Sequence, residues 1–176
     1  MFGNVDIDFT FYRSVSLDPT ITLEQFVSNR VRSYVSFLTL ICDDDYGKSL
    51  IKEICVLGAH ASPVTDENFV DVTAPQVKLE PSAFTELSTR LDLTHSARVK
   101  RTIALNDALE RELPRLNKKI CFKRIDKKML NDESVTNKIY DGRFRLDHHP
   151  NRSEALKLWY KALADKVPAF QERVKS

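Results

Sequence analysis

The residues in this sequence that are best suited to chemistry form a run of cations. From Arg115 to Lys128, seven of fourteen positions are lysine or arginine, with apolar side chains between them. The wider region 98–128 holds eleven basic and four acidic residues, a net charge of +7. Charge of this density can neutralise several phosphates, with an affinity that falls steeply as salt rises. The predicted anion-binding residues are Arg98, Lys100, Arg101, Arg115, Lys118, Lys119, Lys123, Arg124, Lys127 and Lys128.

The same cations allow other interpretations. They could lie on an anionic membrane, where each lysine or arginine near the surface contributes about 1 kcal/mol, or act as a nuclear-import signal. They could also simply keep the exposed edge of a strand from pairing with another strand. Phe122 is the one aromatic residue of the region and no recognition motif is present, so sequence-specific nucleic-acid binding is not expected.

Charge is distributed unevenly along the chain. Residues 1–88 carry six Lys/Arg and thirteen Asp/Glu, a net of −7, whereas residues 89–176 carry twenty-one and twelve, a net of +9. A dipolar molecule of this kind can bind polyanions at one end and copies of itself head to tail. A head-to-tail contact that does not close produces open assemblies. Two solvated faces of unequal sign are the alternative explanation.

Signatures of catalysis and of metal binding are absent from the sequence. There is no nucleophile elbow and no phosphate loop. His148 and His149 are adjacent, and the other histidines stand alone, which disfavours a metal site. The cysteines at 42, 55 and 121 lack ligand spacing and are predicted to be free thiols in a reducing compartment. We expect a non-enzymatic protein without cofactor, metal, small-molecule substrate, signal peptide or membrane span.

Apolar patterning predicts an α+β fold: a single compact domain over residues 1–176, with an antiparallel sheet, flanking helices and a C-terminal helix. Alternating residues over 5–17 predict a long strand with one buried face. The segment 34–41 is rich in β-branched and aromatic residues, and together with 50–57 it predicts the two strands of a hairpin. Residues 119–125 predict a further strand.

Several helices are also expected. Thr22, with glutamine three residues later, predicts a capping box and a helix of about ten residues. Residues 82–91 and 106–113 favour short helices, while 98–105 could be strand or helix. A C-terminal helix is predicted from Ser153, with Trp159 on its apolar face.

The segment of about residues 59–76 has no clear periodicity and contains two prolines and several acids. A stretch of this length without regular structure is uncommon inside a compact domain, so we expect a mobile loop that serves as an interaction arm. Its apolar residues are the predicted self-association site: Phe69, Val70 and Pro75. A loop without a role is the alternative.

The order of these elements resembles a known family. The order of FTFYRSVSL (9–17), TLEQFVSNRV (22–31), YVSFLTLI (34–41), a turn with Gly47-Lys48, and VLGAHASP (56–63) resembles the start of the folded domain of rhabdovirus matrix proteins. The similarity covers about a third of the chain. It is best matched by the plant-infecting type, because a long basic N-terminal arm and the budding motif PPxY are missing.

The resemblance implies a viral matrix-type structural protein that self-assembles into open-ended oligomers. Its implied partners are itself, the nucleocapsid ribonucleoprotein and an anionic membrane surface, which it would bridge during virion assembly. The implied locations are the virion and, in the host cell, the membrane-associated cytoplasm and the nucleus. The residues themselves also allow a small nucleic-acid-binding regulator, such as a silencing suppressor or a phage or plasmid accessory factor. An enzyme of unrecognised type is the third alternative.

Overall fold

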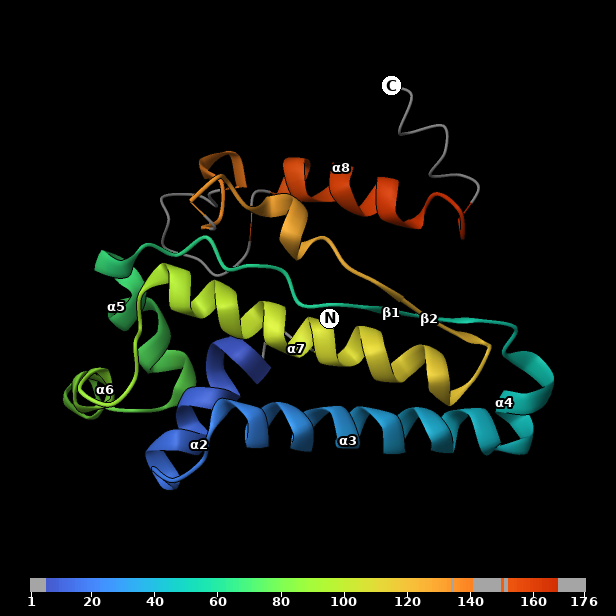
Figure 1. Cartoon of the computed structure of the whole chain (residues 1–176), viewed down its shortest axis with the longest axis horizontal. Coiled ribbons are helices and arrows are strands. Elements are labelled where there is room, and N and C mark those ends of the chain that lie inside the picture. The colour runs from blue at the N-terminus through green and yellow to red at the C-terminus, as the bar shows by residue number, and fades with distance from the viewer. Residues whose placement is uncertain (1–5, 134, 141–149, 151, 168–176) are drawn as a thin grey trace.

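The computed structural model describes residues 6–133, 135–140, 150 and 152–167. Most of this chain is helical (Figure 1). The elements in chain order are the π-helix η1 (Asp6–Thr10), α2 (Phe11–Leu17), α3 (Leu23–Asp43), α4 (Asp45–Leu50), β1 (Ile54–Leu57), α5 (Asp66–Val77), α6 (Pro81–Ser88), α7 (His95–Leu116), β2 (Ile120–Lys123), the 3₁₀ helices η2 (Asp126–Met129) and η3 (Lys138–Tyr140), and α8 (Arg152–Leu163).

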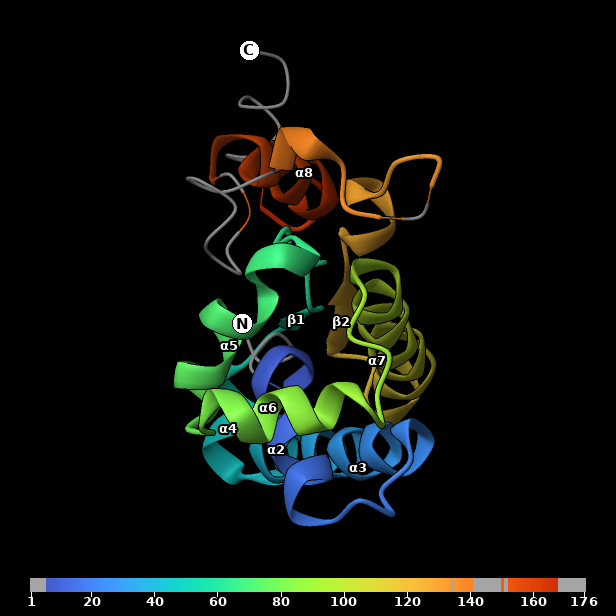
Figure 2. The same cartoon turned by 90° about the vertical axis from the view of Figure 1, so that its left-hand side faces the viewer.

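The two long helices α3 and α7 pack side by side and run in the same direction. The strands β1 and β2 pair in parallel, with Ile54 opposite Ile120 and Leu57 opposite Lys123. Figure 2 shows the sheet end on, with α3 below it, α7 at one side and α8 above. The strands are parallel because α5, α6 and α7 intervene between them and return the chain to the same end of the sheet.

The predicted antiparallel sheet is wrong, and so is the predicted α+β class. The region expected as the first strand is helical, in η1 and α2, and its buried residues are Ile7, Phe11, Tyr12 and Val15. These positions are four, one and three residues apart, which is also the spacing of one face of a helix. The alternation that predicted a strand therefore coincided with a helical stripe.

The predicted hairpin is also wrong, because residues 34–41 lie within α3. The capping box that predicted only a short helix is confirmed: Thr22 Oγ1 accepts from Gln25 N at 3.2 Å, and Gln25 Oε1 accepts from Thr22 N at 2.9 Å. No glycine or proline follows before Asp43. Once nucleated, a helix gains one hydrogen bond per added residue, so it extends across the β-branched segment.

The segment expected as a mobile loop has two structural parts. Residues 58–64 are extended and buried, and residues 66–77 form α5. The buried face of α5 consists of Phe69, Thr73, Ala74 and Val77, a helical spacing that the sequence analysis missed. Pro75 lies in the last turn, and Lys78, with φ of 58°, ends the helix.

The extended segment after β1 is held against α7. Asn106 Oδ1 accepts from Ala59 N at 2.9 Å, and Asn106 Nδ2 donates to Ala59 O at 2.7 Å. A Cβ atom at Gly58 would lie 2.8 Å from Asn106 Oδ1 and 2.9 Å from Phe122 Cζ. A glycine is therefore required for this close approach.

Other predicted elements are confirmed. The helix predicted at 106–113 lies in α7, β2 lies within the strand predicted at 119–125, and α8 is the expected C-terminal helix. Residues 98–105, which could have been strand or helix, are also part of α7. Trp159 of α8 packs on a small second core formed by Ile125, Met129 and Tyr140. The main core includes an aromatic cluster with ring centroids 5.2–5.8 Å apart, formed by Phe11, Tyr12, Phe26, Phe69 and Phe84.

The buried Tyr12 predicts a loss of stability at alkaline pH. Burial raises the pKa of Tyr12 from 10.0 to about 12, an effect that the Arg101 guanidinium partly offsets. The unfolded chain loses this proton near pH 10 and the folded chain near pH 12, so the free energy of unfolding should fall by about 2–3 kcal/mol between them. Tyr12→Phe has no proton to lose at this position, so its free energy of unfolding, measured with urea, should fall less than that of the parent over the same pH range. An equal fall in parent and variant would contradict the assignment.

Candidate interaction surface

Two of the predicted anion-binding residues lie in the core. Arg98 is buried, and its guanidinium carbon lies 4.1 Å from the centroid of the Phe69 ring. Its Nη1 atom donates to Asp66 Oδ1 at 2.8 Å and to Leu93 O at 2.6 Å, and Nη2 donates to Val64 O. Burial lowers the pKa of Arg98, although Asp66 acts in the opposite direction. Arg98 therefore joins α7 to the start of α5.

Arg101 has a similar internal position one turn along α7. It is buried, with its guanidinium over the rings of Phe11 and Tyr12. Its Nη1 atom donates to the Tyr12 hydroxyl at 3.3 Å, and Nη2 donates to Asp92 O. Neither arginine is available to a phosphate group at the surface.

Arg124 is surrounded by carboxylates. Its Nε and Nη2 atoms donate to the two oxygens of Asp126 at 2.7 and 2.6 Å, and Nη1 donates to Asp107 at 2.5 Å and Glu110 at 2.8 Å. Burial acts to lower the pKa of Arg124, but the hydrogen bonds to Asp126 and Asp107 outweigh it and raise the pKa. Lys127 Nζ lies 3.0 Å from Asp107. We call this set of residues the Arg124 network.

The other predicted cations are distributed over the surface. Lys123 Nζ lies 2.8 Å from Asp165, and Lys119 Nζ donates to Lys48 O at 3.1 Å. Lys100 and Arg115 are fifteen positions apart on α7, roughly 22 Å along the helix. Within the described chain, four predicted cations are exposed and have no ion-pair partner: Lys100, Arg115, Lys118 and Lys128. Some cations of the run therefore lie in the core, others are paired with carboxylates, and the rest lie at separate positions on the surface.

The predicted self-association residues do not meet at the surface. Phe69 belongs to the core cluster, Val70 is half-buried, and Pro75 is exposed on α5. Phe69 contacts Tyr12 and Phe84 rather than solvent.

A different surface carries exposed apolar side chains, on the second half of α3. Phe37 is 51% exposed and Leu40 is 71% exposed, and residues three apart are neighbours on a helix. Beside them a groove of about 310 Å³ separates α3 from β1. It is lined by Tyr34, Phe37, Leu38, Ile41 and Ile54–Leu57. We call this groove, together with Leu40, the α3–β1 surface.

The strand in this surface has an unpaired edge. Ile54 N donates to Lys119 O and Gly58 N donates to Lys123 O, both at 2.8 Å. Backbone groups alternate in direction along a strand, so Cys55 and Leu57 direct their N–H and C=O groups away from β2. The sheet contains only β1 and β2 among the described residues, and no hydrogen bond from that part of the chain meets this edge.

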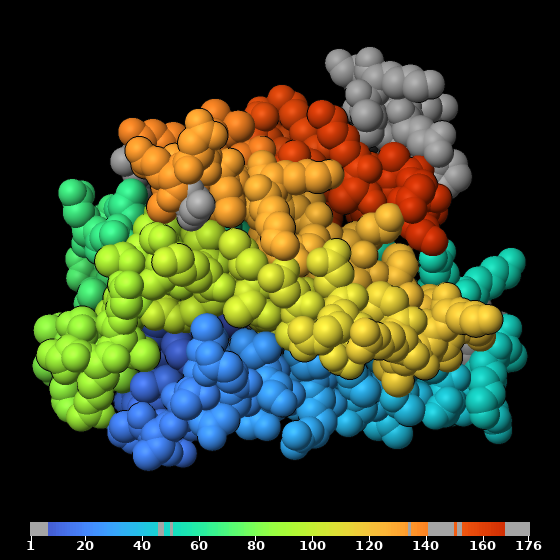
Figure 3. Space-filling view, viewed as in Figure 1, coloured from blue at the N-terminus to red at the C-terminus, as the bar shows by residue number. Residues whose placement is uncertain are grey.

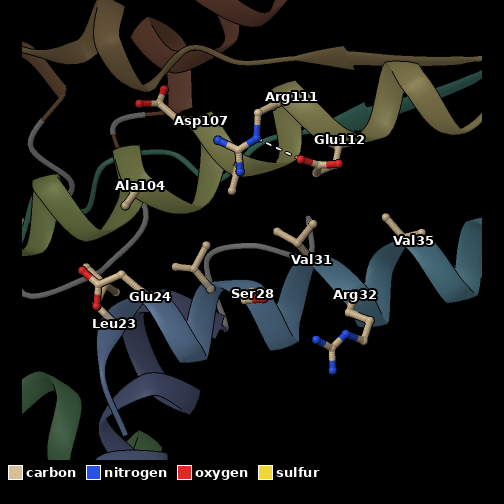
Figure 4. A pocket seen from close by; sticks show the side chains of 12 residues that line it. Leu23, Glu24, Ser28, Val31, Arg32, Val35, Ala104, Asp107, Arg111 and Glu112 are labelled. Atoms are coloured by element: carbon tan, nitrogen blue, oxygen red, sulfur yellow. Dashed lines mark hydrogen bonds and ion pairs between the residues drawn. The ribbon is translucent and has the colours of Figure 1, made fainter.

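A second groove, of about 490 Å³, lies between α3 and α7. Figure 3 shows this face of the molecule, with α3 below α7, and Figure 4 shows the side chains. Valines at 27, 31 and 35 form its apolar wall, and charged residues of both signs surround it, including an Arg111–Glu112 pair at 2.8 Å. Mixed charge without convergent polar groups does not indicate a particular ligand.

Other classes of site are not found in the described part of the chain. It contains no group of three or more His, Cys, Asp or Glu side chains that could hold a metal ion. The adjacent histidines 148 and 149 lie outside the described residues. No described helix combines the length and apolar character needed to cross a bilayer.

Apolar residues at helical spacing in the second half of α3 could have indicated the α3–β1 surface. They were instead interpreted as a strand. The resemblance to rhabdovirus matrix proteins relied on strands at 9–17 and 34–41, and both segments are helical. Comparison with known proteins found no matching family model, no similar curated protein and no matching solved structure.

Proposed function

We propose that this protein is a non-catalytic structural protein whose copies associate through the α3–β1 surface. The observation that supports this proposal is the unpaired edge of β1 beside the exposed apolar side chains of α3. An exposed strand edge is a template for pairing with another chain. The edge of a four-residue strand provides few hydrogen bonds to a partner, but the adjacent helix α3 adds apolar surface that the partner can cover.

A second copy of the chain is the partner that this edge fits best. In an antiparallel pair, Cys55 would face Leu57 of the second copy, and Leu57 would face its Cys55. Each of these two pairs exchanges two backbone hydrogen bonds, so four bonds form about a two-fold axis at Val56. Such an interface uses the same patch on both copies, which is the commonest form of homodimer. The two sheets would join into one of four strands.

The expected affinity is modest. Complete burial of a leucine or phenylalanine contributes about 1.5–3 kcal/mol. In the dimer both copies would bury their Phe37 and Leu40 side chains. Association itself costs about 4–15 kcal/mol in lost translational and rotational freedom. We therefore expect a weak dimer, with a dissociation constant no tighter than roughly micromolar.

This proposal is narrower than the function implied by the matrix-protein resemblance. A two-fold interface closes after two copies, so open-ended assembly would need a second contact. Binding of ribonucleoprotein or an anionic membrane would rest on the separate exposed cations Lys100, Arg115, Lys118 and Lys128.

Sedimentation velocity over about 1–300 µM should show a monomer–dimer equilibrium. Leu57→Pro removes an outward N–H that β2 does not use, and proline is tolerated at a strand edge, so this variant should fold but remain monomeric. Leu40→Glu should also be monomeric, because it places a charge in the apolar contact. Circular dichroism checks that both variants fold.

The matched control is Leu17→Glu. Leu17 is 78% exposed at the end of α2, which lies by the start of α3 and far from the α3–β1 surface (Figure 1). This variant should dimerise like the parent. A parent that is monomeric throughout would mean that another segment or another protein covers the edge, and would overturn the proposal. Dimerisation that survives both Leu57→Pro and Leu40→Glu would overturn it as well.

A further inference from the structure

We propose that Cys55 and Cys121 form a dithiol that is oxidised to an intramolecular disulfide by exchange with a small disulfide such as oxidised glutathione. The two residues are direct partners in the register of β1 and β2. Neighbouring strands are about 4.7–4.9 Å apart, which lies within the Cα–Cα range of about 4.4–6.8 Å found for disulfides. Because the two residues are partners in register, their side chains project from the same face of the sheet.

The face that carries this dithiol lies beside the turn that follows α8. Glu53 and Lys123 lie two positions from the cysteines, on the same face of their strands. Lys123 Nζ lies 2.8 Å from Asp165, and Lys166 pairs with Glu53. These two ion pairs place the turn after α8 beside the thiols, while both cysteines stay partly exposed. A small oxidant can therefore reach them, whereas Cys42 is buried on α3.

The chemistry proceeds by two exchange steps. The Cys121 thiolate attacks oxidised glutathione, forms a mixed disulfide and releases one glutathione thiolate. Cys55 then loses its proton and attacks the Cys121 sulfur, forming the protein disulfide and releasing the second glutathione thiol. The two protein thiols lose two electrons and two protons, and one glutathione disulfide becomes two thiols.

The order of attack follows from the surroundings of Cys55. Burial raises the pKa of the Cys55 thiol to about 12, and its hydrogen bond with Cys121 acts in the same direction. Because the thiolate is the attacking species, Cys55 reacts second. The second step should be slow at neutral pH and faster as pH rises.

The proposal is tested on the native full-length chain with excess oxidised glutathione at about pH 8. The product should be a single chain that has lost two hydrogen atoms, with no disulfide between chains, and peptide mapping should join residues 55 and 121. Two of the three thiols should stop reacting with an alkylating reagent. The disulfide closes a loop of more than sixty residues, so the midpoint of thermal unfolding should rise by roughly 10 °C.

Single substitutions supply the controls. Cys42→Ser should oxidise like the parent, while Cys121→Ser and Cys55→Ser should not form the internal disulfide. Cys55→Ser should instead stop at a mixed disulfide on Cys121. A linkage that involves Cys42, a stable mixed disulfide in the parent, or three free thiols after prolonged treatment would each overturn the proposal. The proposed disulfide joins two residues of the same chain, so its formation does not require self-association. The serine variants also keep the backbone edge of β1, so they should dimerise like the parent.

Discussion

Replacing Arg124 by methionine is expected to lower the free energy of unfolding by about 3–5 kcal/mol, the usual result of removing one partner from a buried ion pair. The side chain of Asp126 is 0% exposed, and Arg124 donates two hydrogen bonds to it. In Arg124→Met the carboxylate of Asp126 would remain buried without its cation. Asp107 and Glu110 would lose the same partner, but both are partly exposed and can be hydrated.

The double variant Arg124→Met with Asp126→Leu distinguishes a buried charge from a general packing defect. Replacing both members of a buried pair by apolar residues is often neutral or stabilising, so the double variant should be more stable than Arg124→Met alone. Urea unfolding at neutral pH measures both. A loss below about 1 kcal/mol in the single variant would show that the pair behaves like an exposed one and would contradict the buried network.

The Arg124 network also affects how anion binding should be tested. A charge reversal that includes Arg124 would combine any loss of binding with a loss of folding. Variants at Lys100, Arg115, Lys118 and Lys128 change exposed charges that have no ion-pair partner within the described residues. These four positions therefore make the cleaner set.

Phe69→Ala is expected to lower the free energy of unfolding by about 3–5 kcal/mol, as for other buried phenylalanines. The ring contacts Tyr12 at 5.5 Å and Phe84 at 5.8 Å between centroids, and it lies beneath Arg98. Its removal leaves a cavity and takes away the aromatic face that the buried guanidinium contacts. In a protein of this size the midpoint of thermal unfolding should fall by roughly 6–20 °C.

The matched control for Phe69→Ala is Asp71→Ala, an exposed position on the same helix. It should change the free energy of unfolding by no more than about 0.5 kcal/mol. Differential scanning calorimetry measures both variants, and sedimentation velocity follows their association. If Phe69→Ala abolished dimerisation while leaving stability unchanged, Phe69 would belong to an interface, as the sequence analysis predicted, and not to the core.

Local signals in the sequence determined several elements. The Thr22–Gln25 capping box set the start of α3, because both of its hydrogen bonds are made within four residues. The apolar face of α8 and the strand at β2 were predicted for the same reason: each depends on its own periodicity or composition. By contrast, the pattern of residues 5–17 fits a strand and a helix equally well. Only packing against α5, α6 and α7 separates the two.

The charges show most clearly what tertiary structure decided. The sequence alone determined that residues 98–128 carry a net charge of +7, and this suggested a surface for polyanions. Folding buries Arg98 and Arg101 and places Arg124 among three carboxylates. Asp66, the partner of Arg98, is 32 residues away, and Asp165, the partner of Lys123, is 42 residues away. Electrostatic pairing depends on distance in space, so net charge along the chain could not reveal which cations stay free, nor that two distant cysteines become neighbours.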